Sequence, residues 1–445
     1  MVVSEMSNNI ASYEKMKDSK ERWLGDIPST WNTRLLKYMF CIKKNIAGET
    51  GHQVLSVTQK GIVPKNMTER GQFSLDYSKY QLVQAGDFVM NHMDLLTGWV
   101  DISKYDGVTS PDYRVFVNIN PNLFDSKYYN YIFQYCYSNR IFYGLGQGVA
   151  GYGRWRLPAD MFLNFVLPVP SIREQKEIAL FLDDQCTRIN SLIEETKKTI
   201  EEYKYWKNSI ILETVTKGIH PNRKMKKCNL EWIAEIPDTW KTERLKARFT
   251  FGKGLPITKE NLVDRGIPVI SYGQIHAKYN SGTSITKSLF RYVPESYIES
   301  NPDSLVHKGD ILVADTSEDI DGCGNGVYID KEIPLFAGYH TIILRSINRD
   351  DNKYLAYLFK SSIWRSQIRT RVSGVKLFSI SKKILSFATI ILPPREEQDE
   401  INQFLDEKCK LIDAIVENKQ ALIADLETYK RSLIYEVATG KKRVV

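Results

Sequence analysis

The stretch KMKDSKERWLGDIPSTWNTRLLKYMF, from Lys15 to Phe40, recurs later in the chain in altered form. The second copy, KMKKCNLEWIAEIPDTWKTERLKARF, runs from Lys224 to Phe249 and aligns without a gap, with 12 of 26 positions identical. An offset of 209 residues is far too long for a solenoid of stacked short repeats. It predicts two copies of one folding unit, related by a pseudo-twofold axis.

A second pair of similar segments closes the two copies. EQKEIALFLDDQC begins at Glu174 and EQDEINQFLDEKC begins at Glu397, an offset of 223 residues. The same offset pairs Gly86-Asp87 with Gly309-Asp310, so the second copy carries a net insertion of 14 residues ahead of Gly309. The ends of the copies are similar and their middles differ. We therefore expect the two halves to assemble in the same way and to contact different ligands.

Both closing segments have the apolar spacing of a coiled coil. Their apolar residues alternate steps of three and four, which is typical of a helix that packs along a seam against another helix. Polar residues occupy the same two seam positions in each helix, Thr196 with Lys419 and Lys207 with Lys430. We expect the two helices to form an antiparallel coiled coil; the alternatives are an independent helical hairpin or a coil between two chains. The predicted apolar seam consists of Leu182, Ile189, Ile193, Ile200, Ile210, Leu405, Ile412, Val416, Ile423 and Leu433.

The middles of the two copies alternate strand and helix patterns. Short apolar segments rich in β-branched residues, such as YRVFVNI in the first half and GDILVAD in the second, predict strands. FDSKYYNYIFQYCYSN and DDNKYLAYLFKSSIW predict helices at matching places. The predicted fold class is α+β, with two pseudo-symmetric repeats that each end in a long helix. The expected divisions are an N-terminal arm at 1–22, a first domain at 23–168, a central helix at 169–222, a second domain at 223–392 and a C-terminal helix at 393–445.

Composition narrows the class of protein without deciding it. The net charge of +8 permits a polyanionic partner but does not require one. The six cysteines have no zinc-type spacing, so we expect reduced structural thiols. No apolar run is long enough to span a bilayer, and the N-terminal residues lack the apolar core of a secretory signal. We therefore expect a cytoplasmic protein.

The sequence contains no recognisable catalytic motif. It lacks GxGxxG, a Walker loop, HExxH, and the NPPY or DPPF motif with which methyltransferases hold a target adenine. The acidic run DTSEDID, at 315–321, does not have the spacing of a calcium loop. We therefore expect neither catalytic residues nor a bound metal or cofactor in this chain.

Two basic segments that contain glycine, and that we therefore expect to be loops, stand at equivalent places before the two closing helices. Arginine donates a bidentate fork to guanine and glutamine pairs with adenine, while arginine and lysine also bind phosphates. The alternative is that these arginines pair with acidic surface groups or with partner subunits. The first segment, around Gly151, carries Gln147, Arg154 and Arg156, and the second, around Gly374, carries Arg365, Arg369, Arg371 and Lys376. Further DNA-binding candidates near the domain starts are Lys43, Lys44, Gln59, Lys60, Lys253, Lys259, Gln274 and His276.

The order of these motifs resembles the specificity subunit of type I restriction–modification systems. The resemblance rests on WLGDIPSTW and WIAEIPDTW, on LPVPSIREQKEIALFLD and LPPREEQDEINQFLD, and on EVATGK near the C-terminus. LSVTQKGIVP, YDGVTSPDYRVF and GDILVADTSED are also similar to that family. Each motif is modest on its own, but their order, twice over, is specific. The resemblance extends from about Lys15 to Lys441.

The resemblance implies a non-catalytic DNA-binding subunit of a restriction enzyme complex. Two target-recognition domains would each read one half of a bipartite site in double-stranded DNA. Two helices would hold the domains apart and dock two methyltransferase (modification) subunits, which carry S-adenosylmethionine for DNA methylation. Separate motor–nuclease (restriction) subunits would use ATP and Mg²⁺. The family binds no cofactor in this subunit.

Three other functions are compatible with parts of the pattern. The chain could serve a methylation-only system, act as a two-headed protein–protein scaffold, or be an enzyme whose site has no familiar motif. If the helices act as a ruler, an insertion near Lys217–Lys226 is expected to lengthen the unread gap in the DNA site without changing either half-site. No side-chain code predicts which bases such domains read.

Overall fold

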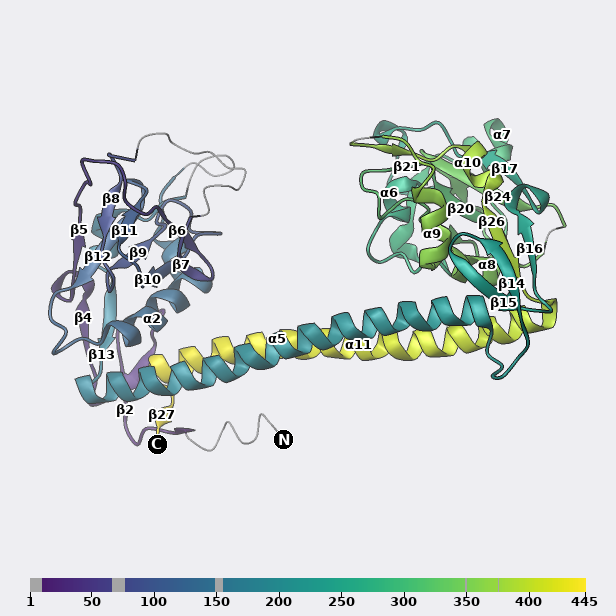
Figure 1. The fold of residues 1–445 in the computed structure, drawn as a ribbon. Coiled ribbons are helices and arrows are strands. Elements are labelled where there is room, and N and C mark those ends of the chain that lie inside the picture. The colour runs from purple at the N-terminus through teal and green to yellow at the C-terminus, as the bar shows by residue number, and fades with distance from the viewer. Residues whose placement is uncertain (1–9, 66–76, 149–154, 349, 375) are drawn as a thin grey trace. The chain divides into compact units, whose positions relative to one another are not determined.

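The structure is a computed structural model that describes residues 10–65, 77–148, 155–348, 350–374 and 376–445. It contains two compact units, residues 1–197 with 420–445 (unit 1) and residues 198–419 (unit 2). Each unit holds one mixed α+β domain and segments of two long helices (Figure 1). Among the described residues, no helix is both long and apolar enough to cross a membrane.

The two long helices are α5 (Ile172–Lys217) and α11 (Arg395–Ala438), and each contributes one half to each unit. In unit 2, Lys207 of α5 pairs with Asp413 of α11, and Tyr203 lies under the ammonium group of Lys419. Residue numbers along α5 thus fall, from 207 to 203, as those of their partners on α11 rise, from 413 to 419. The helices run antiparallel, which confirms the predicted arrangement (Figure 1).

The polar side chains of the seam have partners on their own helix or on the opposite one. The Thr196 hydroxyl donates to the Leu192 carbonyl at 2.7 Å, and Lys430 Nζ donates to Asn190 Oδ1 at 2.8 Å. Lys207 Nζ lies 2.6 Å from Asp413 Oδ2. Polar pairs of this kind across a seam favour the register in which they form. The apolar seam residues are placed as follows: Leu182, Ile189, Ile193, Ile200, Leu405, Ile412 and Leu433 are buried, and Ile210, Val416 and Ile423 are half-buried.

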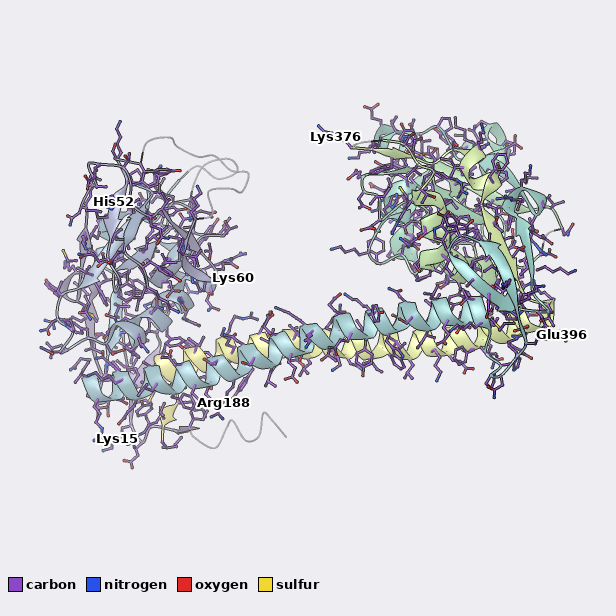
Figure 2. The ribbon with its side chains drawn as sticks, viewed as in Figure 1. Lys15, His52, Lys60, Arg188, Lys376 and Glu396 are labelled. Carbon is purple, nitrogen blue, oxygen red and sulfur yellow. The ribbon has the colours of Figure 1, made fainter. Side chains whose placement is uncertain are left out.

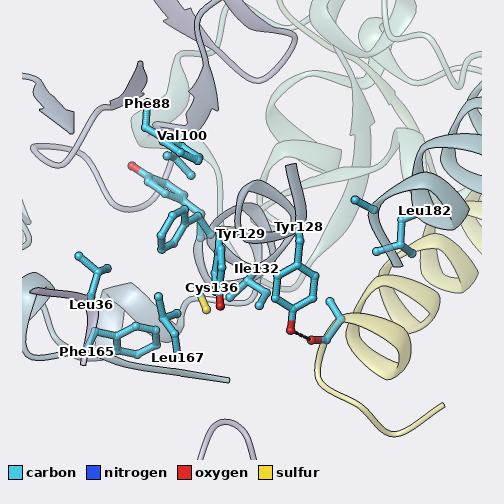
Figure 3. Packing of buried hydrophobic residues seen from close by; sticks show 14 of the residues in the cluster. Leu36, Phe88, Val100, Tyr128, Tyr129, Ile132, Cys136, Phe165, Leu167 and Leu182 are labelled. Carbon is cyan, nitrogen blue, oxygen red and sulfur yellow. Dashed lines mark hydrogen bonds between the residues drawn. The ribbon is translucent and has the colours of Figure 1, made fainter. Parts of the chain in front are cut away.

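The domain of unit 1 is built on an antiparallel four-stranded sheet in the order β10-β9-β12-β5. Helix α2 (Ser126–Ser138) begins at Asp125, whose carboxylate accepts the Tyr128 backbone N–H at 2.9 Å. Its buried face packs edge-to-face against sheet aromatics, with Phe133 and Phe40 ring centroids 5.3 Å apart. Figure 3 shows this core. The sheet strands are β5 (Phe40–Lys43), β9 (Phe88–Met90), β10 (Val100–Ile102) and β12 (Arg114–Asn118).

Smaller elements complete unit 1. The N-terminal residues pair with both ends of the unit, because β2 pairs with β3 and β1 pairs with the C-terminal strand β27. The remaining elements are β1 (Ile10–Ala11), β2 (Met16–Asp18), β3 (Asp26–Pro28), β4 (Asn32–Leu35), η2 (Leu36–Tyr38), β6 (Leu55–Thr58), β7 (Gly61–Pro64), β8 (Gln81–Val83), β11 (Gly107–Thr109), α3 (Ile141–Gly144), α4 (Ala159–Leu163), β13 (Val166–Val169) and β27 (Arg443–Val444).

The domain of unit 2 repeats this plan with an added sheet. Its antiparallel four-stranded sheet has the order β17-β24-β20-β22, and a three-stranded sheet has the order β19-β18-β23. The segment predicted as one helix forms two, because Ser361 ends the first and its side chain accepts the Trp364 N–H to cap the second. The main elements are β17 (Phe249–Lys253), β18 (Ile267–Ile270), β19 (Arg291–Val293), β20 (Ile311–Ala314), β22 (Gly326–Tyr328), β23 (Phe336–Ala337), β24 (Thr341–Ser346), α8 (Lys353–Lys360) and α9 (Ser362–Arg369).

The short elements of unit 2 lie at the edges of these sheets and at the start of the unit. They are β14 (Met225–Leu230), β15 (Ile233–Pro237), β16 (Lys241–Arg244), η3 (Leu245–Ala247), η4 (Lys259–Asn261), α6 (Tyr272–Ile275), η5 (Lys287–Leu289), α7 (Tyr297–Ser300), η6 (Pro302–Ser304), β21 (Thr316–Ser317), β25 (Phe378–Ser379), α10 (Lys382–Phe387) and β26 (Thr389–Leu392). Strands are abundant in both units, so the predicted α+β class is confirmed.

A glutamate carboxylate, half-buried in unit 1 and buried in unit 2, joins each domain to the start of its own long helix. Trp31 Nε1 donates to Glu174 Oε2 at 3.0 Å, and Trp240 Nε1 donates to Glu397 Oε2 at 2.9 Å. Both tryptophans are fully buried. The other oxygen of Glu174 accepts the Tyr13 hydroxyl, whereas Glu397 forms an ion pair with Arg223. Two motifs that revealed the repeat, I-P-x-T-W and E-Q, thus form the two sides of one joint.

A tyrosine joins each domain to the end of the other repeat's helix. The Tyr128 hydroxyl donates to the Ala438 carbonyl at 2.8 Å in unit 1 (Figure 3). The Tyr354 hydroxyl donates to the Val215 carbonyl at 3.0 Å in unit 2. Each tyrosine therefore satisfies a carbonyl near a helix C-terminus, where backbone acceptors lack partners within the helix. Each domain is held by two helices rather than one.

An ion pair inside each domain also repeats. Lys43 Nζ lies 2.9 Å from Asp87 Oδ2, and Arg345 Nη2 lies 3.0 Å from Asp310 Oδ2. The two aspartates are the repeated Gly-Asp positions of the alignment, and both are buried. Each aspartate also accepts a backbone N–H three residues ahead of it. These carboxylates fix the turn that leads into strand β9 or β20.

We predict that Glu397→Gln destabilises unit 2 while Glu396→Gln does not. The glutamine can still accept from Trp240. However, Arg223 loses the negative charge with which it pairs at this buried site, at a cost of about 2 kcal/mol. Glu396 is the exposed neighbour on the same turn of α11 (Figure 2). Amide hydrogen exchange of α8 in the two variants measures the difference. Equal protection in both would contradict the structural role of Glu397.

We also predict that Lys43→Met destabilises unit 1 and Lys44→Met leaves it unchanged. Lys43 is 18% exposed and its Asp87 partner 8%, so the substitution leaves a buried carboxylate without its counter-charge, at a cost of about 3 kcal/mol. Lys44 is exposed. The measurement is amide hydrogen exchange in strands β9 and β12. If Lys43→Met retained full protection, the ion pair would not support this turn.

Candidate nucleic-acid interface

The basic segments dock at equivalent points of the two domains. In unit 1 the Leu157 N–H donates to the His92 carbonyl at 2.9 Å, just beyond the end of β9. In unit 2 the Ile380 N–H donates to the Asp315 carbonyl at 2.7 Å, just beyond the end of β20. Leu157 and Ile380 are 223 positions apart, and so are His92 and Asp315, which is the offset of the sequence alignment. The same backbone contact therefore holds both segments against the end of the same strand.

Unit 1 brings Gln147 and Arg156 together. The Gln147 N–H donates to the Arg156 carbonyl at 2.8 Å, and the reverse bond is 3.0 Å. Residues paired in this way across two antiparallel segments carry their side chains on one face. Both are exposed, so an amide and a guanidinium lie side by side on the surface. Arg154 and Gly151 fall at 149–154, outside the described residues.

Arg114 and His92, which the sequence reasoning missed, support this pair. Arg114 is buried and its Nη2 donates to the Leu157 carbonyl at 2.8 Å, which fixes the segment that carries Arg156. Burial, together with the charges of Arg114 and Arg156, lowers the pKa of His92 to about 4. His92 is therefore neutral near pH 7. The signal available in the sequence was YDGVTSPDYRVF, which contains Arg114 but does not show where it points.

The other candidates of unit 1 differ in their surroundings. Gln59 and Lys60 form the exposed turn of the β6–β7 hairpin (Figure 2). Lys44 is also exposed. Lys43 is held inside the domain by Asp87, with a further bond to Gln84 at 2.8 Å. Three of these four side chains are thus free to meet a ligand, and Lys43 is committed to the fold.

Two of the three arginines of unit 2 do not lie in the loop that the glycine of their segment had suggested. Arg365 and Arg369 lie on helix α9, one turn apart, and both donate to the Asp321 carbonyl at 2.8 Å. Arg369 also forms an ion pair with the Asp321 carboxylate at 3.1 Å. Arg371 donates to the Gln367 carbonyl at 2.7 Å and lies over the Trp232 ring. These contacts favour the alternative of internal pairing for Arg369.

Two further candidates of unit 2 are also engaged within the domain. The Gln274 side chain accepts the Ser271 N–H at 3.1 Å as part of a helix cap. His276 Nε2 lies 2.8 Å from the Thr316 carbonyl oxygen, and Nδ1 lies 3.1 Å from Asn325. The exposed candidates are Lys253, Lys259 and Lys376. Lys376 lies at the end of the domain away from α5 and α11 (Figure 2).

Comparison with known proteins accounts for both repeats. The family "Type I restriction modification DNA specificity domain" matches residues 28–202 and 237–426. The type I restriction enzyme MjaVIII specificity subunit of Methanocaldococcus jannaschii is 26% identical over 66% of this chain and 66% of that protein. The putative MjaX specificity subunit of the same organism is 24% identical over 98% of this chain and 99% of that protein.

Solved structures share the fold at low sequence identity. One, described as the structural basis of complex assembly and conformational transition of the type I R-M system, has a TM-score of 0.68 and 14% identity, over 93% of this chain and 99% of its own. The HsdS subunit of Thermoanaerobacter tengcongensis has a TM-score of 0.51 and 14% identity, over 93% of this chain and 98% of its own. The family match extends over both repeats. The chain therefore belongs to the specificity subunits of type I restriction–modification systems, as a non-catalytic DNA-recognition component with two target-recognition domains.

Proposed function

We propose that this subunit reads a bipartite site in double-stranded DNA, one half-site per target-recognition domain. The observation that carries the proposal is the repeated docking of the basic segments at the ends of β9 and β20. The backbone frame is the same at both places, but the side chains differ. Position 92 is a neutral histidine beside two arginines, whereas its counterpart, Asp315, is a carboxylate. Two domains with the same backbone contacts but different side chains suit two different half-sites.

The candidate residues divide by the kind of contact they can make. Gln147 and Arg156 present an amide and a fork on one face, the groups that read adenine and guanine edges. The exposed lysines of both domains suit phosphates, which fix the position of a protein on DNA without reading sequence. They are Lys44, Lys60, Lys253, Lys259 and Lys376.

The catalytic chemistry of this proposal belongs to partner subunits. Two modification subunits would bring S-adenosylmethionine and methylate adenine, and motor–nuclease subunits would bring ATP and Mg²⁺. The subunit would act in the cytoplasm, where the chromosomal DNA of a bacterial or archaeal cell lies. A methylation-only system would use the same subunit without the motor–nuclease partner. A protein–protein scaffold, the other alternative, would show no salt-dependent DNA binding.

The long helices suit the role of a ruler for the unread gap between half-sites. Helix α5 has 46 residues and is continuous, so its length is about 70 Å at 1.5 Å per residue. The expected effect of an insertion near Lys217–Lys226 has to be revised. Helix α5 ends at Lys217 and β14 begins at Met225, so most of that segment connects elements and contributes nothing to helix length.

The function is tested by mapping methylated bases in cells that produce the modification subunits with or without this chain. We expect adenine methylation at one bipartite site only when the chain is present. The purified chain alone, given S-adenosylmethionine and DNA, is expected to transfer no methyl group. Methylation at the same site without the chain would refute the proposed function, and so would methyl transfer by the chain alone.

The ruler is tested by inserting seven residues into both helices, after Thr199 in α5 and after Gln420 in α11. One heptad in each keeps the seam in register and adds about 10 Å, or about three base pairs of DNA at 3.4 Å each. We expect a longer gap with both half-sites unchanged. Binding should weaken, because three base pairs also turn one half-site by about a third of a helical turn.

The matched control places the same seven residues after Pro221, in the connection between α5 and β14. This variant is expected to keep the original gap because neither helix is lengthened. Both sites are read from methylation of a DNA library with randomised half-sites and gaps. An unchanged gap in the double insertion, or altered half-sites, would refute the ruler.

A further inference from the structure

A histidine is held by a carboxylate and a hydroxyl at the end of β20. His340 Nδ1 lies 2.8 Å from Asp315 Oδ1 and 3.2 Å from Thr316 Oγ1. The Thr316 hydroxyl also donates to Asp315 Oδ1 at 2.7 Å. The backbones are joined as well, since the Asp315 N–H donates to the His340 carbonyl at 3.1 Å. The contact with the carboxylate fixes a proton on Nδ1 and sets the plane of the imidazole.

Two tyrosines pack against the same imidazole. The ring centroid of Tyr339 lies 3.9 Å from that of His340, and the Tyr272 centroid lies 5.5 Å away at an interplanar angle of 85°. The His340 side chain is 35% exposed and Tyr339 is 43% exposed. Within the part of the chain that the structure describes, Nε2 of His340 has no hydrogen-bond partner. The imidazole is thus held in place through Nδ1, while Nε2 is available to a ligand.

The backbone at this position is unfavourable for histidine. His340 has φ of 55°, in the left-handed region that favours glycine. It follows the buried strand β23 and precedes β24, and the Tyr339 N–H is held by the Ser271 hydroxyl at 3.1 Å. Glycine would form this turn with less strain. A non-glycine residue kept in such a conformation at a ligand-facing turn indicates that its side chain has a use.

The histidine stands beside the segment that carries Lys376. Strand β21, directly after Asp315, pairs with β25, and the Ile380 N–H donates to the Asp315 carbonyl. The carboxylate that orients His340 is therefore the residue whose backbone holds the basic segment. In unit 1 the position equivalent to Asp315 is His92, which lies near Arg156. His340 and the segment that carries Lys376 are thus both held by Asp315.

We propose that His340 reads one base of the half-site bound by the second target-recognition domain, with Asp315 as its positioning residue. This inference rests on the proposed function, because it assumes that this domain contacts DNA. With Nδ1–H directed at the carboxylate, a neutral ring offers Nε2 as an acceptor for the amino group of adenine or cytosine. A protonated ring would instead donate to an acceptor of guanine or thymine.

The decisive variant is His340→Gly in the full chain, assembled with its modification subunits. Glycine suits the backbone at φ 55°, so we expect unit 2 to melt at the same temperature or higher. Methylation of a DNA library with randomised half-sites gives the preference at every position. We expect discrimination at one position of one half-site to fall by about 10- to 100-fold, with the other half-site and the gap unchanged. Asp315→Asn is expected to lower discrimination at the same position to a smaller extent.

His307→Ala is the matched control, because His307 also pairs with a carboxylate, Glu332, at 3.1 Å, but ahead of the start of β20 rather than beyond its end. It is expected to leave every preference unchanged. Unchanged discrimination in His340→Gly, or an equal loss at all positions, would overturn the assignment. Either result, with a bipartite site still methylated, leaves the proposed function standing. Loss of chain-dependent methylation in the unsubstituted complex would refute the proposed function itself.

Discussion

The architecture depends on two carboxylates, the half-buried Glu174 and the buried Glu397. A buried carboxylate is stable only when strong donors satisfy it, and here each accepts an indole N–H from the opening motif of its own repeat. Removal of either partner leaves a charge or a polar group unpaired in the interior. The opening motif and the closing helix of each repeat have therefore stayed alike. The tyrosine hydroxyls of Tyr128 and Tyr354 add a second attachment to the other helix.

This double attachment explains why the domains could diverge. The joint uses the edge of each domain next to the helices, and the buried Asp87 and Asp310 fix the turns that lead into β9 and β20. The side chains of His92 and Asp315, beyond the far end of these strands, take no part in that joint. Position 92 is histidine in one copy and position 315 is aspartate in the other, on the same backbone frame. Under the proposed function, a change of side chain there would alter recognition without loosening the joint.

The sequence predicted what depends on periodicity and missed what depends on distant partners. The repeat follows from identical residues at offsets of 209 and 223, and the strands and long helices follow from local spacing of apolar residues. Arg369 pairs with Asp321, 48 residues away, and its segment is a helix rather than the loop that its neighbouring glycine suggested. Lys43 pairs with Asp87, although the repeated Gly-Asp positions were a usable signal. His340 stands outside any motif, and only the backbone at its turn distinguishes it.

If the long helices act as the proposed ruler, the polar seam residues make its length independent of the DNA sequence that is read. Lys430 meets Asn190 in one unit and Lys207 meets Asp413 in the other. Each pair uses a lysine at the same seam position of its own helix, so both units enforce the same helix register. Substitutions in the domains cannot reach this register. Under the proposed function, separate parts of the chain thus control which bases are read and how far apart they lie.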